Sequence, residues 1–93
     1  MSTAVESASR PRMASYVRLV FDQVRERHML LAPESVSVLN PTGAAVLGLC
    51  DGRRTVAEIV AELRGQSDHL ACDEVLGFLS RLAAKRYVEV DDD

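Results

Sequence analysis

Three short stretches in the first half of the chain have the apolar patterns of β-strands, and the first of them alternates between apolar and polar residues. In the first stretch, Val17, Leu19 and Phe21 fall on one side of an extended backbone, whereas Arg18 and Asp22 fall on the other. Charged or proline-containing segments separate the stretches, and such segments favour tight reversals. The sequence therefore predicts an antiparallel meander with strands at residues 17–24, 28–31 and 36–39.

The second half of the chain changes to the 3.6-residue period of helices. The first predicted helix has Asn40 as its N-cap and Pro41 at its first position. Gly52 can adopt the left-handed backbone conformation that commonly ends a helix. Thr55 and Glu58 have the spacing of a capping box, which predicts the start of a second helix. The predicted helices run from residue 41 to just before residue 52, from 55 to 64 and from 73 to 86.

This order of elements predicts an α+β fold, in which a three-stranded antiparallel sheet is followed by three helices in a winged-helix-like arrangement. Residues 87–90 alternate, and they form either a final strand or a strap that returns to the body. Residues 1–15 carry only scattered apolar side chains and are expected to be a flexible N-terminal tail. The predicted domain is residues 16–90, and residues 91–93 are an acidic tail.

The charge balance narrows the classes of partner. The formal net charge is −3, which equals the contribution of the three C-terminal aspartates, so the rest of the chain is neutral overall. A surface that binds nucleic acid through its phosphates normally shows a basic excess. The sequence has no run of about 20 apolar residues and no apolar segment typical of a signal peptide. We therefore expect no nucleic-acid partner, no membrane partner and a cytoplasmic location.

The cysteines and histidines do not form a recognisable reactive site. Cys50 and Cys72 lie 22 residues apart, and neither has an adjacent basic residue that would stabilise a thiolate. We expect two buried thiols rather than a disulfide. His28 lies within an apolar strand and His69 in a loop, where structural roles are the ordinary ones. Because phosphate-binding, metal-binding and nucleophile motifs are also missing, the sequence predicts no enzyme, no catalytic residue, no metal site and no cofactor.

Two helices followed by a short strand also resemble a winged helix-turn-helix, so nucleic-acid binding stays as an alternative. Asp73 and Glu74 would begin the recognition helix, where base and phosphate contacts are usually made. The loop before this helix is also longer than the roughly three or four residues that are usual. Both features disfavour this alternative.

Residues 36–39 are the part of the predicted sheet most able to bind another chain. If they lie at the sheet edge, their free N–H and C=O groups can pair with an added strand. On the last helix, Phe78 would floor a groove beside that strand, and Arg81 or Lys85 would pair with peptide carboxylates. The alternative is an aromatic residue at the core boundary with a solvated basic flank, and a helical wheel leaves open which border of the helix lines the groove. The candidate residues are Val36, Ser37, Val38 and Leu39 on the strand and Val75, Phe78, Leu79, Arg81, Leu82 and Lys85 on the helix.

Two stretches of the chain resemble a known family. They read LLAPESVSVLNPTG at residues 30–43 and LCDGRRTVAEI at residues 49–59, and the likeness extends over about residues 16–90. In these stretches the chain is similar to the PqqD family, small proteins of pyrroloquinoline quinone (PQQ) biosynthesis. The resemblance implies three strands followed by three helices, which is the order already predicted from the residues.

The resemblance also implies a function and partners. PqqD-like proteins are peptide chaperones, which bind the leader of the ribosomally made (RiPP) precursor peptide PqqA and present it to the radical-SAM enzyme PqqE. Related recognition domains take their leader as an extra strand beside the third strand and against the third helix, which correspond here to residues 36–39 and 74–85. Binding of the quinone product is a further alternative. An open edge would also allow a strand-exchanged homodimer besides a monomer.

Overall fold

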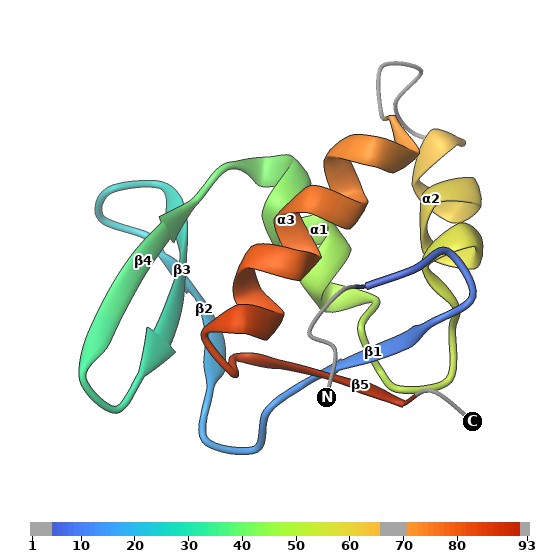
Figure 1. Cartoon of the computed structure of the whole chain (residues 1–93). Coiled ribbons are helices and arrows are strands. Elements are labelled where there is room, and N and C mark those ends of the chain that lie inside the picture. The colour runs from blue at the N-terminus through green and yellow to red at the C-terminus, as the bar shows by residue number, and fades with distance from the viewer. Residues whose placement is uncertain (1–4, 66–70, 92–93) are drawn as a thin grey trace.

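The computed structural model describes residues 5–65 and 71–91, in which three helices pack against a three-stranded sheet and a two-stranded pair (Figure 1). The α+β class and the predicted order of three strands and three helices are confirmed, and two further strands are added to it. The strands are β1 (Arg10–Met13), β2 (Arg18–Asp22), β3 (Arg27–Ala32), β4 (Ser35–Leu39) and β5 (Val88–Asp91). The helices are α1 (Pro41–Gly48), α2 (Val56–Arg64) and α3 (Cys72–Ala84).

The meander β2–β3–β4 forms as the alternation predicts, and both of its strand pairs are antiparallel. Directly opposite residues of neighbouring strands share one face of a sheet. Leu30 is buried and lies opposite Ser37, so Ser37 and Leu39 face the core. Val38 lies opposite Met29 and therefore belongs to the other, outer face. The meander thus has a core face around Leu30 and a partly apolar outer face.

The helices begin at the predicted capping residues. The Asn40 side chain accepts a hydrogen bond of 2.7 Å from the Gly43 N–H, and Pro41 occupies the first turn of α1. Thr55 Oγ1 accepts from the Glu58 N–H at 3.1 Å, and Glu58 Oε1 accepts from the Thr55 N–H at 2.8 Å, which completes the capping box. Such caps each stabilise a helix by about 1 kcal/mol.

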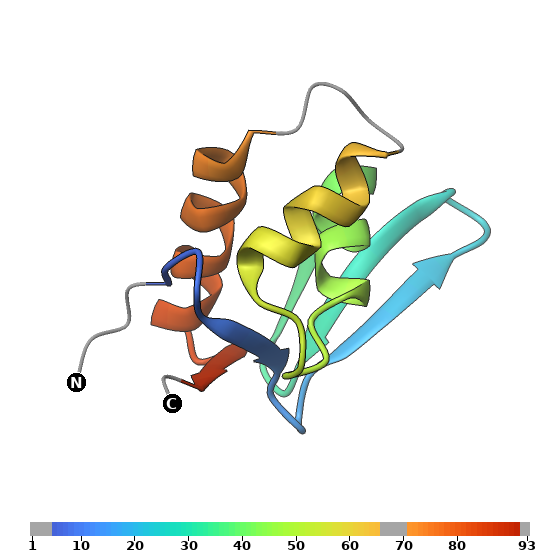
Figure 2. The ribbon, with the colours of Figure 1, turned by 90° about the vertical axis from the view of Figure 1, so that its right-hand side faces the viewer.

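α1 is the central element of the molecule, because it contacts all three strands of the meander and both other helices (Figure 2). Its buried side chains meet those of the sheet and of the other helices in one aliphatic core. No helix among the described residues is long and apolar enough to cross a membrane. The largest fully buried side chains are Leu30, Leu47, Ile59, Leu79, Val46, Val56 and Pro11.

The N-terminal segment differs from the flexible tail that the sequence predicts. Residues 10–13 form β1, which pairs antiparallel with β5 and places Arg12 opposite Glu89. These two side chains form an exposed ion pair, with 3.1 Å between Arg12 Nε and Glu89 Oε1. Of the two alternatives for residues 87–90, the structure shows the strand. Asp91, which the sequence assigns to an acidic tail, is the last residue of that strand.

The residues before β1 supply hydrogen-bond acceptors for the first turn of α2. The Ser9 carbonyl accepts a hydrogen bond from the Val56 N–H, and the Ser7 carbonyl accepts one from the Ala57 N–H, each of 3.0 Å. N–H groups in the first turn of a helix have no acceptor within the helix. The N-terminal segment therefore supplies partners that α2 lacks, and Val5 of this segment is buried in the core.

α1 is shorter than predicted. It ends at Gly48, with Leu49 as its C-cap, rather than just before Gly52. Gly52 does adopt the left-handed conformation, with φ at 81°, but it does so in the turn that leads to α2. In that turn its N–H donates to the Pro11 carbonyl at 3.0 Å, so β1 holds the turn in place. The other two helices begin and end within two residues of the predicted limits.

Candidate functional site

β4 is an edge strand with one side unpaired. It pairs with β3 on one side, and no described strand pairs with the other. α3 lies on the β4 side of the meander, whereas β2 lies on the far side (Figures 1 and 2). On the outer face, Val36 and Val38 are 61% and 60% exposed. An apolar strand with free N–H and C=O groups along one side can accept another strand.

Two contacts fix how β4 is oriented relative to α3. At the start of the strand, the hydroxyl oxygens of Ser35 and Tyr87 are 2.5 Å apart, and Tyr87 follows the C-terminal end of α3. At the other end, β4 leads directly into α1, where a Cβ atom at Gly43 would lie 3.1 Å from Phe78 Cζ of α3. The strand therefore begins near the end of the helix, and the two elements run in opposite directions. We call the surface that they form together with the intervening hollow the β4–α3 face.

The hollow lies between the N-terminal end of α1 and α3 and has a volume of about 380 Å³. Its apolar walls come from the buried Val46 and Val75 and from the half-buried Phe78. Because Gly43 has no side chain, the Phe78 ring can lie against the first turn of α1. A hollow of this kind can hold an apolar side chain of a bound peptide. Its lining residues are Asn40, Thr42, Gly43, Val46, Asp73, Glu74, Val75, Gly77, Phe78 and Arg81.

The structure brings together only part of the residues that the sequence singled out on the last helix. Val75, Phe78 and Arg81 line the hollow. Leu79 and Leu82 are 0% and 7% exposed and instead pack within the core.

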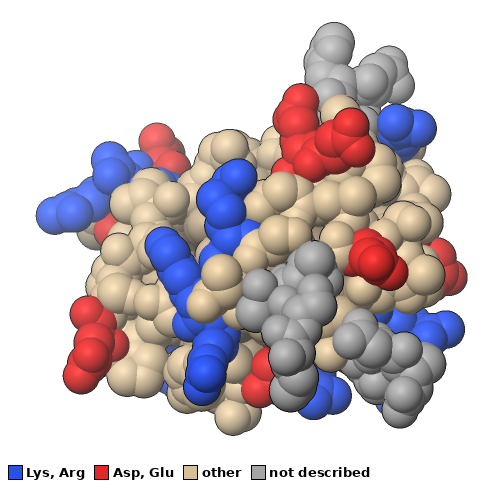
Figure 3. All heavy atoms as spheres, in the orientation of Figure 1, with Lys and Arg blue, Asp and Glu red and all other residues tan. Residues whose placement is uncertain are grey.

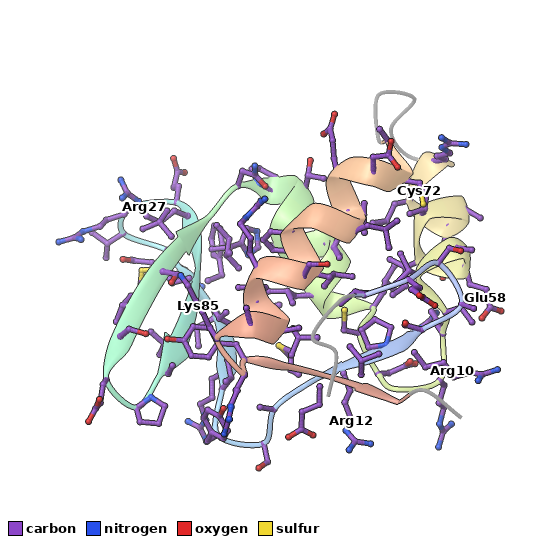
Figure 4. The ribbon with its side chains drawn as sticks, viewed as in Figure 1. Arg10, Arg12, Arg27, Glu58, Cys72 and Lys85 are labelled. Atoms are coloured by element: carbon purple, nitrogen blue, oxygen red, sulfur yellow. The ribbon has the colours of Figure 1, made fainter. Side chains whose placement is uncertain are left out.

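The remaining candidates flank the hollow without lining it. Lys85 is exposed beyond the hollow and leaves the end of α3 on the side of the meander (Figure 4). On the strand, Val36 and Val38 belong to the outer face, Ser37 is half-buried on the core face, and Leu39 is buried. The hollow begins immediately after the strand, at Asn40.

Several lining residues were missed at the level of sequence. Asn40 is predicted as a helix cap, and Thr42 and Gly43 as helical residues in the stretch that resembles the PqqD family, but none of the three as a site residue. Asp73 is considered only as an argument against nucleic-acid binding, and Glu74 otherwise only as the first residue of the helix face that the family resemblance implies. The missing signal is tertiary, because the first turn of α1 and the first half of α3 meet only in the folded chain.

Charge is unevenly distributed along the β4–α3 face. The first turn of α3 carries Asp73 and Glu74, whereas Arg81, Lys85 and Arg86 lie at its other end. Figure 3 shows acidic side chains gathered at the upper end of α3 and basic side chains over its lower half and the adjoining meander. This acidic first turn matches the favourable end of the helix dipole. It also places negative charge where a recognition helix would meet phosphates, which weighs against the winged-helix alternative.

The two cysteines and His28 lie in packing environments and not in a reactive site. Burial raises the pKa of the Cys50 thiol to about 12, so it stays protonated, and its Sγ lies 3.2 Å from the Val46 carbonyl oxygen. Cys50 and Cys72 are both free thiols, the first buried and the second half-buried. The His28 ring packs on Phe21, with 4.8 Å between ring centroids. His69 lies outside the described residues, and within them no three His, Cys, Asp or Glu side chains gather as a metal site.

Comparison with known families identifies the family to which this fold belongs. The family model of coenzyme PQQ synthesis protein D (PqqD) matches residues 27–88, which is 62 of the 93 residues. The chain belongs to the PqqD family. The resemblance seen in the two sequence stretches is thereby confirmed.

Two curated relatives show how PqqD sequences occur in other proteins. A bifunctional coenzyme PQQ synthesis protein C/D of Methylorubrum extorquens is 43% identical over 91 residues, covering 94% of this chain and 24% of its own length. The chain therefore spans about a quarter of that relative. A PqqA binding protein of Rhodopseudomonas palustris (strain TIE-1) is 36% identical over 88 residues, covering 91% of this chain and 86% of the relative.

A solved relative has the same fold. The solution NMR structure of the PqqD truncation of Methylobacterium extorquens PqqCD matches with a TM-score of 0.73 at 40% identity, covering 94% of this chain and 96% of that chain. That protein is described as a functional and stand-alone RiPP recognition element. The PqqD family is one of peptide-recognition proteins rather than enzymes, as the sequence predicts.

Proposed function

We propose that this protein is a peptide chaperone of PQQ biosynthesis. It binds the leader of the precursor peptide PqqA as an added strand on β4 and presents that peptide to the radical-SAM enzyme PqqE in the cytoplasm. The observation that carries the proposal is the unpaired edge of β4 beside the hollow between α1 and α3. The nature of the peptide is supported by relatives that are named a PqqA binding protein and a RiPP recognition element.

Strand addition uses the groups that β4 leaves free. Main-chain hydrogen bonds to the open edge give an affinity that tolerates sequence variation, and pockets for alternate side chains give specificity. Side chains on one face of the added strand lie next to Val36 and Val38, and those on the other face point toward Phe78 and the hollow. The bound segment is therefore apolar on both of its faces.

Presentation is the way in which a peptide-binding protein can promote a reaction that another protein catalyses. The leader is disordered when free, so its binding must offset the cost of ordering it. We expect a micromolar or tighter dissociation constant, equivalent to about 8 kcal/mol or more of binding free energy. When the chaperone also contacts the enzyme, the attached core peptide reaches a high effective concentration at the catalytic centre.

The experiment is a titration of the full chain with a synthetic PqqA leader, followed by calorimetry and by backbone amide NMR. Saturable binding with amide shifts concentrated on residues 35–43 and along α3 supports the proposal. A parallel titration with duplex DNA at ~150 mM salt tests the winged-helix alternative. Binding of DNA without any response to the leader, or leader shifts confined to β1 and β5, contradicts the proposal.

The unpaired edge also bears on the oligomeric state. Free edges favour pairing between copies of a chain. We propose that the monomer prevails in dilute solution and that strand exchange yields a homodimer only at high concentration. Light scattering across a concentration series measures this balance, and a dimer that persists at micromolar concentration contradicts it.

A further inference from the structure

The β4–α3 face has opposite charges at its two ends, and these charges have no partners within the described chain. Asp73 and Glu74 are exposed at the acidic end and also line the hollow. Lys85 is exposed at the basic end, and the exposed Arg81 lies between it and the acidic end, where it also lines the hollow. In residues 5–65 and 71–91, none of these four side chains takes part in a hydrogen bond or an ion pair. Both ends are therefore available to charges on a bound peptide.

The direction of β4 relative to these charges is fixed by the contacts at its two ends. The Ser35 and Tyr87 hydroxyls meet at the start of β4 and at the basic end of α3. Phe78 meets Gly43 just beyond the end of β4, next to the part of the hollow that Asp73 and Glu74 line. β4 thus runs from the basic end of the face toward its acidic end.

An added strand can run parallel or antiparallel to β4. The two directions differ in which end of the peptide lies near the acidic residues of α3 and which lies near the basic ones. Every strand pair among the described residues is antiparallel, and antiparallel pairs are slightly more stable per residue. A strand added antiparallel to β4 runs from the acidic end of the face toward the basic end. Its N-terminal part then lies near Asp73 and Glu74, and its C-terminal part lies near Arg81 and Lys85.

We propose that the β4–α3 face selects the direction of its peptide by charge order. The preferred peptide carries a basic residue at the N-terminal end of its bound segment and an acidic residue at the C-terminal end, with apolar residues between. This inference rests on strand addition as the proposed function and adds the chemistry of the peptide that is recognised.

The helix also sets the spacing of the two charges. Glu74 and Lys85 are 11 residues apart along α3, or about 16 Å at a rise of about 1.5 Å per residue. A strand covers this distance in about five residues at about 3.3 Å each. Arg81 folds back over Gly77, because a Cβ atom there would lie 3.6 Å from Arg81 Nη1, so it offers a second positive charge closer to the acidic end. Alternate residues of a strand face the same side, so both peptide charges face α3 only at an even spacing, and we expect the basic and acidic residues to be about four positions apart.

A pair of host peptides tests the charge order. GKVIVEG and GEVIVKG have the same composition and the same apolar core, and their charges are four positions apart, on one face of the strand, but reversed. The dissociation constant of the full chain is measured for both, with the natural PqqA leader as a third arm. We expect the Lys-first peptide to bind about tenfold more tightly, because two attractive contacts worth a few-fold each replace two repulsive ones. The difference should shrink at high salt.

Charge-reversal variants of the protein test whether the basic residues of α3 cause the preference for the Lys-first peptide. Arg81→Glu should reduce or abolish the preference for the Lys-first peptide, whereas Arg25→Glu, which makes the same charge change in the β2–β3 hairpin, should leave it unchanged. Circular dichroism and the melting temperature show whether each variant is folded. If Arg81→Glu does not fold, Lys85→Glu provides a second test.

The outcomes separate the two proposals. If the leader binds but the two host peptides bind equally, or if neither host peptide binds, the charge-order inference is wrong and strand addition stands. If the Glu-first peptide binds more tightly, the inference is wrong because the added strand is parallel to β4. If the leader itself does not bind, the proposed function fails.

Discussion

Within the part of the chain that the structure describes, each outer strand of the meander has one side without a strand partner, and these two edges differ in what protects them. β2 reads Arg-Leu-Val-Phe-Asp, with a charged residue at each end, whereas β4 reads Ser-Val-Ser-Val-Leu, with no charge at all. Charged side chains on an edge strand discourage pairing with another chain. The β2 edge also lies on the side of the meander away from α3, whereas the β4 edge lies beside the hollow. The same sheet therefore has one edge that resists an added strand and one that is suited to accept it.

The outer face of the sheet sharpens this contrast. Arg18 on β2, Leu31 on β3 and Val36 on β4 form one row across the strands, and Val20, Met29 and Val38 form the next. In the first row the side chain changes from a cation to an aliphatic residue as the row approaches β4. An added strand beside β4 would extend both rows with apolar neighbours, and such cross-strand pairs stabilise a sheet by about 0.2–1 kcal/mol each.

The largest expected effect is the loss of leader binding when an outward N–H of β4 is removed. Neighbouring residues of a strand direct their N–H groups to opposite sides. Of Ser37→Pro and Val38→Pro, one therefore breaks the ladder to β3, and the other removes only a donor from the free edge. The variant that stays folded should bind the leader at least about 100-fold more weakly, equivalent to about 2.7 kcal/mol. Calorimetry gives the affinity, and circular dichroism identifies the folded variant.

The matched control places proline in the other edge strand. Leu19→Pro and Val20→Pro form the same kind of pair in β2, and the folded member of that pair should bind the leader as the unmodified protein does. If prolines in both edges weaken binding equally, the effect is general damage to the sheet. If the folded β4 variant binds normally, the leader does not use that edge.

A smaller effect is expected from the aromatic ring beside the hollow. Phe78→Ala removes the apolar wall that faces Gly43, so leader affinity should fall about tenfold, in line with the burial of an aromatic side chain by a ligand. Because Phe78 is only half-buried, we expect a loss of folding stability of about 1–2 kcal/mol, below the range for fully buried aromatic residues. Urea unfolding measures the stability, and calorimetry measures the affinity.

The control for this variant is the other phenylalanine of the protein. Phe21 lies on β2, is 50% exposed and packs on His28. Phe21→Ala should leave leader affinity unchanged while slightly lowering stability. An equal loss of affinity in both variants would show that aromatic residues act through the stability of the sheet rather than through contact with the peptide.

Local sequence signals predicted the parts of this fold that local interactions determine. The alternation around Leu19 and Leu39, the N-cap Asn40 and the capping box of Thr55 and Glu58 all concern residues within a few positions of one another, and each recurs in the structure. β1 has no such signal. Its partner β5 lies almost 80 residues away, and Pro11 is fully buried although prolines are usually exposed.

The site was harder to predict than the fold because it is assembled from two helices and a strand. The sequence singles out Val75, Leu79 and Leu82 together as groove candidates, because a helical wheel does not distinguish side chains that meet the core from those that border the hollow. The structure separates them, since only Val75 of the three lines the hollow. Asp73 and Glu74 become part of the site only because α1 begins opposite them.

The smallest expected effect comes from exchanging the charges of the two edges. Arg18→Val and Val36→Arg change the two ends of one row across the sheet, so the doubly substituted protein keeps its composition and net charge. Val36→Arg should weaken leader binding about three- to tenfold, because a long charged side chain on β4 costs apolar contact with the added strand. Arg18→Val should leave leader binding unchanged and increase self-association, which light scattering detects. If Val36→Arg binds the leader normally, charge does not distinguish the edges, and the hollow beside α3 alone accounts for the difference between them.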